Sequence, residues 1–406
     1  MARRIKSKHQ QVASLEAELL RRVRARGGLS RAQLARELKL APSTAGIYVD
    51  RLVHEGFLLE TEAAGHETAG RPPTSLVPSS DGGRFIGVDF EARNLMATVV
   101  DFSQQPLRQV HKMLRPTDSA TQILAKIELA IDEMMEHDPR PVLGIGVGVP
   151  GAIDPVTNVA VHYNFIKGWS DVPLGARLSE RFGVPVFLEN NIRTMALAEL
   201  WFGAGRGLRN FVCIGIRSGI AAGVVVNGHL LHGVHHRAGE IGHWVCPVPA
   251  ELADDAPTRG EDAWRWQAGA RLEQVASISG MVAAAQRGLS RKQKSSLAGV
   301  KDELTIDHIL AAADDGDAFA LSLVRAAGRV HGWVAHQVNE LFNPERIIFA
   351  GPLADSGNLF LAFVRETARE LSDASRDLVI VNSALGQYNG AIGAAALALH
   401  QWTPKR

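Results

Sequence analysis

The sequence is poor in cysteine and has no long apolar segment. Its 406 residues include two cysteines, Cys213 and Cys246, too few for a disulfide framework or for a zinc site built from cysteines. No apolar run approaches the roughly 20 residues that cross a bilayer, so we expect no membrane segment. The N-terminus MARRIKSKHQQ lacks the apolar stretch and cleavage site of a secretory signal. These absences predict a cytoplasmic protein.

Length and charge indicate at least two parts. A single hydrophobic core stops growing at about 250–300 residues, so this chain needs more than one. Residues 1–60 contain twelve Lys and Arg against six Asp and Glu, a net charge of +6, whereas the whole chain carries +1. The rest of the chain is therefore acidic. A basic N-terminal segment on an acidic body indicates a polyanion-binding module joined to a second function.

Three short helices are predicted near the N-terminus. In residues 14–26, apolar side chains recur at helical spacing and arginines occupy the other face. Ser30 caps a second helix over RAQLARELKL, and a turn at 41–43 leads into a third helix over 44–56. We expect these helices to bury Leu15, Leu19, Leu20, Val23, Ile47, Val49, Leu52 and Val53. Their order and spacing are typical of a helix-turn-helix.

The segment that follows predicts a wing. FLLETEAAGHETAGRPPTSLV contains two short strands around a flexible tip. We expect the third helix to face base edges or phosphates and an arginine of the wing to enter the minor groove. The residues predicted to contact DNA are Ser43, Thr44, Tyr48, Arg51 and Arg71. The alternative is a small helical bundle used for dimerisation, with its arginines solvated.

After a linker at 79–83, strands and helices alternate in a mixed α/β pattern. RFIGVDFEARNLMATVVDF predicts two strands joined by a turn, and VLGIGVGVPGAID and PVFLEN predict buried strands. NFVCIGIRSGIAAGVVVNGHLLHG predicts a glycine-rich hairpin. Helices are predicted over 120–136, 193–201, 305–315 and 317–341. The last of these contains His331, Trp333 and His336 and is either a subunit interface or part of the core.

Five motifs of the body resemble the ROK family of repressors, open reading frames and kinases. They are VPGAID, HYNFIKGWSDVPL, LENN with ALAE, SGIAAGVVVNG and AGEIGHW. The most specific of these signals is the combination of GEIGH, NFIKGW and the Glu-Asn-Asn strand end. The resemblance as a whole covers essentially the entire chain. The N-terminal module resembles the winged helix-turn-helix of the family's repressor branch.

The resemblance implies an α/β fold with three parts. Residues 1–78 would form the winged helix-turn-helix. A two-lobed actin-like ATPase fold, which is ribonuclease H-like and shared with sugar kinases, would follow. Its first lobe would span 84–200 and be completed by a C-terminal helix at about 386–402. The second lobe would span 201–385 and carry a dimerisation surface.

The resemblance also implies a sugar site. In this chain the site would consist of Gly151, Asn164, Asn190, Asn191, Glu240, His243 and Glu273. Carboxylates and amides suit the paired hydroxyls of a pyranose, because they accept or donate hydrogen bonds in a cleft. Trp169 is either a stacking platform or a packing residue, and packing is favoured.

The chain departs from the family's kinases in the groups that do chemistry. Asn191 occupies the position of the aspartate that takes the sugar's proton, and losing a general base costs about 10²–10⁴-fold in rate. Glu91 replaces a glycine of the first phosphate-binding turn, where its charge repels phosphate. The second phosphate loop contains Arg217, and the Gly-Gly near adenosine is Gly351-Pro352. We therefore predict no catalytic residue and no enzyme activity.

The family's zinc site lacks its cysteines. Trp264, Trp266 and Arg271 occupy the positions that resemble the zinc-binding cysteines, so His243 remains with only Cys246 nearby. We therefore expect neither zinc nor any other cofactor.

Three functions are compatible with these features. The favoured one is a transcriptional regulator of carbohydrate genes, most simply a repressor. Its partners would be operator DNA, a sugar or sugar-derivative effector, and further copies of the chain in a homodimer or homotetramer, without a membrane. The second is a docking platform for a protein partner. The third is a residual sugar kinase.

Overall fold

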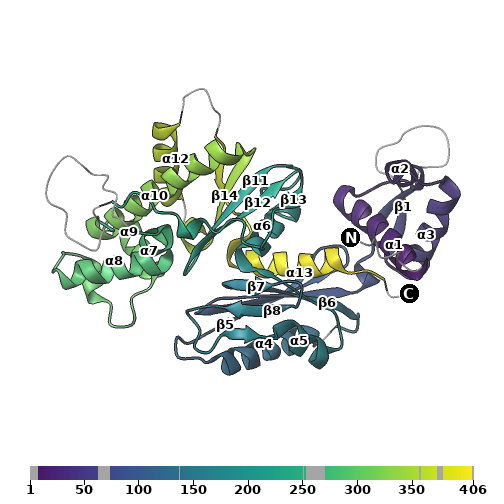
Figure 1. Cartoon of the computed structure of the whole chain (residues 1–406), viewed down its shortest axis with the longest axis horizontal. Coiled ribbons are helices and arrows are strands. Elements are labelled where there is room, and N and C mark those ends of the chain that lie inside the picture. Colours follow the sequence, from purple (N-terminus) through teal and green to yellow (C-terminus); the bar gives the residue numbers. More distant parts are fainter. Residues whose placement is uncertain are drawn as a thin grey trace. The chain divides into compact units, whose positions relative to one another are not determined.

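The computed structural model describes residues 8–62, 74–136, 138–249, 251–252, 270–355, 358–372 and 378–404. It divides into two compact units, and the elements keep the labels of Figure 1. The first unit comprises Met1–Glu189 and Ala391–Arg406, and the second comprises Asn190–Gly390. The chain therefore passes between the units twice, after Glu189 and after Gly390.

The first unit begins with a head of three helices and a hairpin (Figure 1). The helices are α1 (Lys8–Arg26), α2 (Arg31–Glu37) and α3 (Pro42–His54), and the antiparallel strands are β1 (Leu58–Glu62) and β2 (Thr74–Pro78). Ser30 caps α2 in a reciprocal pair of hydrogen bonds with Gln33. The elements have the order predicted for a winged helix-turn-helix, although α1 and α3 begin earlier than expected.

Two expectations about the faces of these helices were wrong. Ile47 was expected in the core, but its side chain is 60% exposed. The reason is that α3 buries the face that contains Ala45 and Val49. Arg24 was expected on the solvated face of α1, but it is buried, and its guanidinium donates a hydrogen bond to the carbonyl of Leu399 at 3.1 Å.

Each unit contains a five-stranded sheet, and the two sheets have the same strand order. The order is β10-β6-β3-β4-β5 in the first unit and, read from the opposite edge of the sheet, β15-β14-β11-β12-β13 in the second. In both, three strands form an antiparallel meander and a later strand pairs parallel to the first of them. This duplicated order confirms the ribonuclease H-like, actin-like fold.

The strands of the first sheet are β3 (Arg84–Phe90), β4 (Asn94–Asp101), β5 (Pro106–Met113), β6 (Val142–Val149) and β10 (Val186–Asn190). Those of the second are β11 (Phe211–Ile216), β12 (Ile220–Val226), β13 (His229–Leu230), β14 (Arg346–Ala350) and β15 (Ile380–Asn382). A small sheet of the first unit contains β7 (Ala152–Asp154), β8 (Val159–His162) and β9 (Ser170–Val172). This third sheet was not predicted, because its strands are too short to show periodicity.

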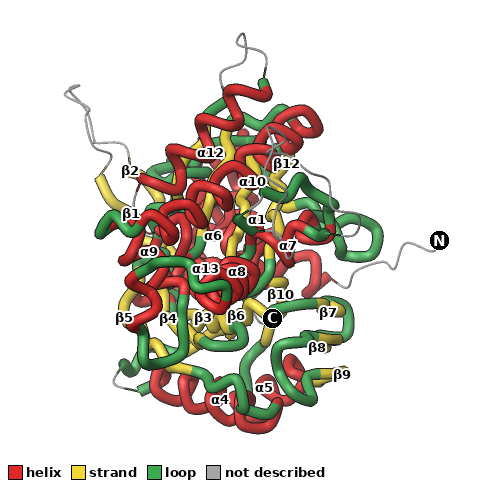
Figure 2. The backbone as a smooth tube through the Cα atoms, turned by 90° about the vertical axis from the view of Figure 1, so that its left-hand side faces the viewer, coloured by secondary structure: helices red, strands yellow, loops and turns green. Residues whose placement is uncertain are grey.

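Helices cover both faces of the first sheet (Figure 2). They are α4 (Ala120–Met135) and α5 (Leu174–Phe182) on one face and α13 (Asn389–Gln401) on the other. Gly87 and Gly146 are partners across β3 and β6. A Cβ there would lie 2.0 Å from the carbonyl oxygen of Ala391 or 1.8 Å from that of Ala394, respectively. These two glycines therefore allow α13 to pack with its backbone against the sheet.

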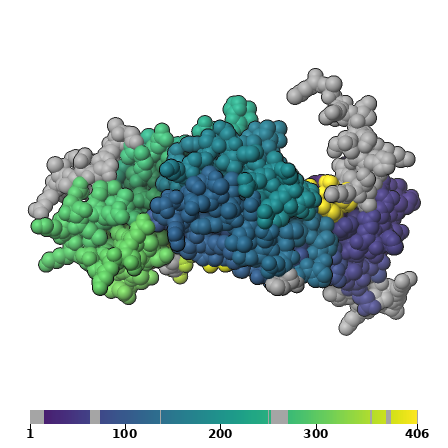
Figure 3. Space-filling model, turned by 90° about the horizontal axis from the view of Figure 1, so that it is seen from below, coloured from purple at the N-terminus to yellow at the C-terminus, as the bar shows by residue number. Residues whose placement is uncertain are grey.

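The segment 79–83, predicted as a linker, is a packed turn. Ser79 caps a single turn of 3-10 helix at Ser80–Gly82, and its N–H donates to the carbonyl of Phe57. A Cβ on Gly82 would lie 3.0 Å from the ring of Phe102. In the space-filling view, the C-terminal residues lie against the head (Figure 3). The head therefore shares a hydrophobic cluster with the first sheet and α13.

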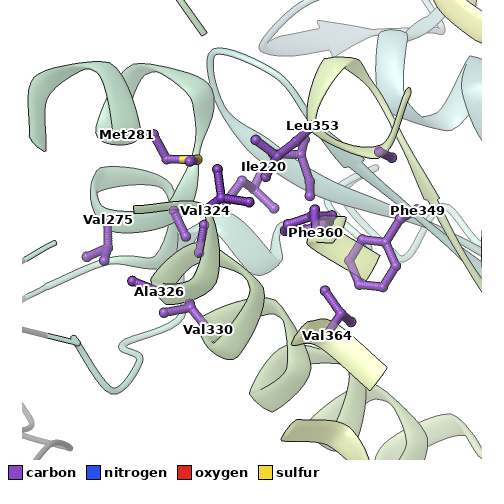
Figure 4. Close-up of a cluster of buried hydrophobic side chains, with 14 of the residues drawn as sticks. Ile220, Val275, Met281, Val324, Ala326, Val330, Phe349, Leu353, Phe360 and Val364 are labelled. Atoms are coloured by element: carbon purple, nitrogen blue, oxygen red, sulfur yellow. The ribbon is translucent and has the colours of Figure 1, made fainter. Parts of the chain in front are cut away.

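The core of the second unit lies between its sheet and several helices. They are α6 (Asn191–Trp201), α7 (Leu272–Ala276), α8 (Ile278–Ser290), α9 (Ile306–Asp314), α10 (Ala318–Phe342), α11 (Pro352–Asp355) and α12 (Asn358–Leu371). Val324 and Val330 of α10 lie in the same cluster as Phe349 of β14 and Phe360 of α12 (Figure 4). None of the helices within the described ranges is long and apolar enough to cross a membrane.

Two expectations concern this unit. It begins at Asn190, so α6 belongs to it, whereas the expected boundary between lobes was at residue 200. The helix 317–341, considered as an interface or as core, is α10. His331 of α10 is fully buried, and its Nε2 donates to the carbonyl of Ala276 at 3.0 Å. Burial lowers the pKa of His331 to about 4, which is typical of a core histidine.

Candidate functional site

The N-terminal half of α3 has an exposed face. Ser43 at its start is exposed, and Thr44 and Tyr48 are half-buried. Ile47 lies in the same stretch and is exposed, a position that the sequence reasoning had placed in the core. Hydroxyl groups can bond phosphates or base edges, and an exposed isoleucine can contact a thymine methyl group. This face of α3 is therefore the candidate DNA-reading surface.

Arg51, the remaining predicted contact on α3, has partners within the head. Its guanidinium forms an ion pair with the buried carboxylate of Glu16 on α1 at 3.0 Å. It also lies over the ring of Tyr48, 5.7 Å from the centroid. These contacts give Arg51 a structural role in joining α1 to α3. Arg71 in the wing lies outside the described residues.

Acidic neighbours pair with several cations of the head. The pairs are Arg21–Glu18, Arg22–Glu18, Arg22–Glu37, Arg26–Glu37, Arg31–Asp50 and Arg31–Glu60. Arg36 and Lys39 are exposed, and neither forms an ion pair with a described residue. Both flank the turn between α2 and α3. Among the described residues, Arg36 and Lys39 therefore place positive charge at this turn, beside the candidate surface.

Two of the predicted sugar residues lie together in the first unit. Gly151 has φ of 75°, and a Cβ there would lie 2.2 Å from the carbonyl oxygen of His162, so only glycine fits. Asn164 is exposed, and its Oδ1 lies 2.6 Å from Nε2 of His162. Trp169 is buried and packs edge-to-face on Phe90 at 5.1 Å between centroids, which confirms the packing interpretation.

The other five predicted sugar residues belong to the second unit. Nε2 of His243 lies 3.8 Å from Oε1 of Glu273. A Cβ on Gly219 would lie 3.8 Å from Oε2 of the same carboxylate, so Glu273 faces the loop that contains Arg217. Glu240 directly precedes the short 3-10 helix Ile241–His243. These polar groups gather beside the loop between β11 and β12.

The strand end Glu-Asn-Asn becomes the start of α6. Oδ1 of Asn190 accepts hydrogen bonds from two backbone N–H groups of the first turn, at 3.0 and 3.3 Å, and so caps the helix. Asn191 is buried, and the first turn contains no acidic residue. Arg193 donates to the carbonyl of His236 at 2.8 Å. This bond ties the asparagine pair to the loop that leads to Glu240.

The two segments at the phosphate-loop positions are occupied by charged side chains. Glu91 is buried in the turn between β3 and β4, and its carboxylate accepts a hydrogen bond from Asn94 at 3.3 Å. Arg217 is buried as well, and its N–H donates to the carbonyl of Gly219 at 2.9 Å, which closes the loop. A fixed carboxylate in the first turn disfavours a phosphate by charge repulsion.

Among the residues that the structure describes, no group of three His, Cys, Asp or Glu is arranged to hold a metal ion. Cys246 is buried, and burial raises the pKa of its thiol to about 11, which disfavours a metal-binding thiolate. Arg271 is exposed at the start of α7. Trp264 and Trp266 lie outside the described residues.

Three comparisons relate the chain to known proteins. The DNA-binding transcriptional repressor Mlc of Escherichia coli K12 is 26% identical over 375 residues, which cover 91% of this chain and 89% of Mlc. A glucokinase of Halalkalibacterium halodurans is 30% identical over 325 residues, 78% of this chain and 95% of the glucokinase. A solved ROK family transcriptional regulator, described as a homologue of E. coli Mlc, has a TM-score of 0.77 at 25% identity and covers 96% of both chains.

These matches differ in how much of the chain they include. The glucokinase is almost completely covered by 78% of this chain, whereas Mlc and the solved regulator match more than nine-tenths of it. The model of the ROK family matches residues 85–401, which begin after the head. The body of the chain is therefore common to kinases and regulators. The protein is a member of the ROK family.

Proposed function

We propose that the protein is a DNA-binding transcriptional regulator of carbohydrate genes, most simply a repressor, whose body binds a sugar effector without transferring phosphate. The start of α6 carries this proposal. Asn191 occupies the position where the resemblance places a kinase's aspartate, and the first turn of α6 has no acidic residue. An amide can hold a hydroxyl by hydrogen bonds, but it cannot take its proton near neutral pH.

The sugar site of this proposal consists of the seven residues named above. Within the second unit, Glu273 and His243 lie side by side, and Arg193 ties the asparagine pair to the segment before Glu240. The amides and carboxylates suit a polyhydroxylated ligand. The buried Glu91 supports a body that does not bind nucleotide phosphates.

The head supplies the DNA-binding half of the proposal. Its exposed α3 face and the cations at the α2–α3 turn suit a duplex. We propose a homodimer or homotetramer, in which two heads bind the two half-sites of an operator. A sugar that binds more tightly to one arrangement of the two heads would then change how well they fit the operator DNA. His331 is buried within the chain, whereas Trp333 and His336 of the same helix are half-buried, so these two are the residues of this stretch that a second subunit could contact.

A residual sugar kinase is the second candidate, and the 30% identity to a glucokinase favours it. The test is ATP consumption by the purified chain with glucose, xylose and N-acetylglucosamine in the presence of magnesium. We expect no turnover above the protein-free background. Sustained, sugar-dependent turnover would replace the proposed sensor by an enzyme. A docking platform for a protein partner becomes the better explanation if none of the sugars raises the melting temperature.

The candidate DNA surface is tested by Ile47→Glu. We expect binding to the DNA upstream of the protein's own gene to weaken at least about tenfold, because the change places a negative charge among base or phosphate contacts. The melting temperature should change little, since Ile47 is exposed.

Electrophoretic mobility shift at several salt concentrations measures this effect, and affinity should fall steeply with salt. The matched control is Val156→Glu, which changes an exposed valine of the body and should bind like the wild type. Unchanged DNA binding by Ile47→Glu would show that this face of α3 does not meet the duplex.

A further inference from the structure

A buried polar cluster lies at the C-terminal end of α6. Oε1 of Glu199 accepts hydrogen bonds from Oγ of Ser383 at 2.5 Å and from Nδ2 of Asn389 at 2.9 Å. Its Oε2 accepts from the N–H of Ala204 at 2.8 Å. Glu199, Ser383 and Asn389 are all buried. Removing a donor from such a carboxylate leaves a desolvated group unsatisfied, so the cluster holds its members firmly in place.

The cluster joins two helices that lie next to the two crossings between the units. Asn190 and Asn191 begin α6 directly after the first crossing, and Glu199 lies two turns further along. Asn389 is the first residue of α13, and the second crossing follows one residue later. The bond between Glu199 and Asn389 therefore connects the helix of the predicted sugar site to the helix that enters the first unit.

Each of these helices is tightly packed on its own sheet. A Cβ on Gly215 would lie 2.5 Å from the side chain of Ile192, and one on Gly223 would lie 2.3 Å from Cβ of Ala196, so α6 touches the second sheet closely. In the first unit, Gly87 and Gly146 likewise allow α13 to touch its sheet closely. Since close-packed interiors deform little, each helix moves with its sheet.

The C-terminal end of α13 lies inside the core of the head. Arg24 of α1 donates to the carbonyl of Leu399, and its guanidinium carbon lies 4.1 Å from the ring centroid of Phe102. Trp402, directly after α13, packs edge-to-face against Phe57 and Phe102 at 5.1 and 5.7 Å between centroids. A displacement of α13 therefore acts directly on α1.

The contact of Arg24 is only partly satisfied. Its Nε and Nη2 are buried without a hydrogen-bond partner among the described residues. Burial lowers the pKa of Arg24 to about 9, with a smaller contribution from Arg21. A buried charge with few partners stabilises an interface less than an apolar side chain of similar size. The contact between the head and α13 is therefore one that a small displacement can alter.

We propose that Glu199 and Asn389 transmit the state of the sugar site to the DNA-binding head, through α6, α13 and Arg24. This inference rests on the proposed function. A ligand that shifts the start of α6 shifts Glu199, the hydrogen bond carries the shift to Asn389, and α13 carries it to α1. The ligand can change DNA affinity only to the extent that it binds more tightly to one of the two positions of α6 and α13.

The test compares Asn389→Ala with Ser383→Ala in the full-length protein. Both variants remove one donor from Oε1 of Glu199. Ser383→Ala also removes the Oγ that accepts from Nδ2 of Asn389 at 2.9 Å, but only Asn389→Ala breaks the direct bond between Glu199 and α13. The readout is the ratio of DNA dissociation constants with and without the panel sugar that most raises the wild-type melting temperature. Wild-type ratios for coupled sites are about 5–150-fold.

We expect the ratio to fall to within about twofold of unity in Asn389→Ala and to stay close to the wild-type value in Ser383→Ala. Sugar affinity and DNA affinity measured separately should change less than threefold by the same reasoning, because Asn389 touches neither ligand. Because coupling between two binding sites is reciprocal, DNA should also no longer change the sugar affinity of Asn389→Ala.

Arg24→Met provides an independent variant at the other end of the route. It removes the bond to Leu399 but keeps a side chain of similar length, and it should fold because it also removes a poorly satisfied buried charge. We expect the same loss of coupling. A responsive wild type together with fully responsive Asn389→Ala or Arg24→Met proteins would overturn this inference alone. A wild type that responds to no sugar would overturn the proposed function and this inference together.

Discussion

Gly146→Ala should destabilise the protein by about 3 kcal/mol or more, because overpacking a closed core costs about 1–3 kcal/mol and here the obstacle is rigid backbone. The new methyl group would lie 1.8 Å from the carbonyl oxygen of Ala394 and would push α13 off the sheet. For a unit of this size we expect the melting temperature to fall by roughly 6–12 °C. Thermal denaturation followed by circular dichroism measures the change.

Gly144→Ala in the same strand is the matched control. A Cβ at Gly144 has no neighbour closer than 3.5 Å, which is ordinary van der Waals contact. This variant should be neutral or up to about 1 kcal/mol more stable, because alanine has less freedom in the unfolded chain. Equal melting temperatures for the two variants would contradict the close packing of α13 on the first sheet.

Acidification from pH 7.5 to 5 should destabilise the second unit through His331 by about 2 kcal/mol. Burial lowers the pKa of His331 from 6.5 to about 4 in the folded protein. Below pH 6.5 the unfolded chain therefore binds a proton that the folded protein does not, so stability decreases as pH falls and continues to decrease to about pH 4. The full effect is about 3 kcal/mol.

His331→Phe removes this titration. The variant leaves the carbonyl of Ala276 without its donor and should be less stable at pH 7.5. Between pH 7.5 and 5, the free energy of unfolding of this variant should decrease by about 2 kcal/mol less than that of the wild type. Trp333→Phe, on the same helix, perturbs the core without removing a titratable group and should keep the full pH dependence. Urea unfolding at both pH values tests this, and parallel pH profiles for His331→Phe and wild type would refute it.

Much of the architecture follows from local patterns in the sequence. The predicted core positions Leu19, Leu20 and Val23 are buried, as helical periodicity requires. The cap at Ser30 and the antiparallel hairpins β3–β4 and β11–β12 also agree with prediction. These features depend on residues close in sequence, so the chain specifies them locally.

Ile47 shows where a local pattern was misjudged. Ala45, Val49 and Leu52 are separated by four and three residues and form one face of α3, whereas Ile47 lies on another. The prediction gave weight to side-chain hydrophobicity and neglected alanine as a core residue. The spacing contained the signal, and it would have identified an exposed apolar residue on the candidate DNA surface.

Other features depend on contacts between distant parts of the chain and left no local signal. Arg24 resembles the other arginines of α1, and its burial depends on Leu399, which is 375 residues away. Glu199 belongs to the recognised ALAE motif, but its bond to Asn389 spans 190 residues. A family resemblance indicates which helix or strand such a residue belongs to, but the contact between two side chains that are distant in sequence is seen only in the structure.

Within the candidate site, the resemblance assigned seven residues to sugar binding, and this assignment stays a prediction. Several of them have hydrogen-bond or ion-pair partners within the protein. Asn190 uses its Oδ1 to cap α6, so its replacement would weaken the helix as well as any ligand contact. Glu273, which is half-buried, is therefore a better position than Asn190 for separating ligand binding from folding.

The central claim is tested most directly by fluorescence anisotropy of labelled upstream DNA bound to the full chain and titrated with glucose, xylose or N-acetylglucosamine. At least one sugar should shift the DNA dissociation constant by about fivefold or more, without added ATP, and Asn191→Leu should remove the response. Tight DNA binding that no sugar changes, or a response that requires ATP, would contradict an account in which this ROK body senses a sugar that it does not phosphorylate.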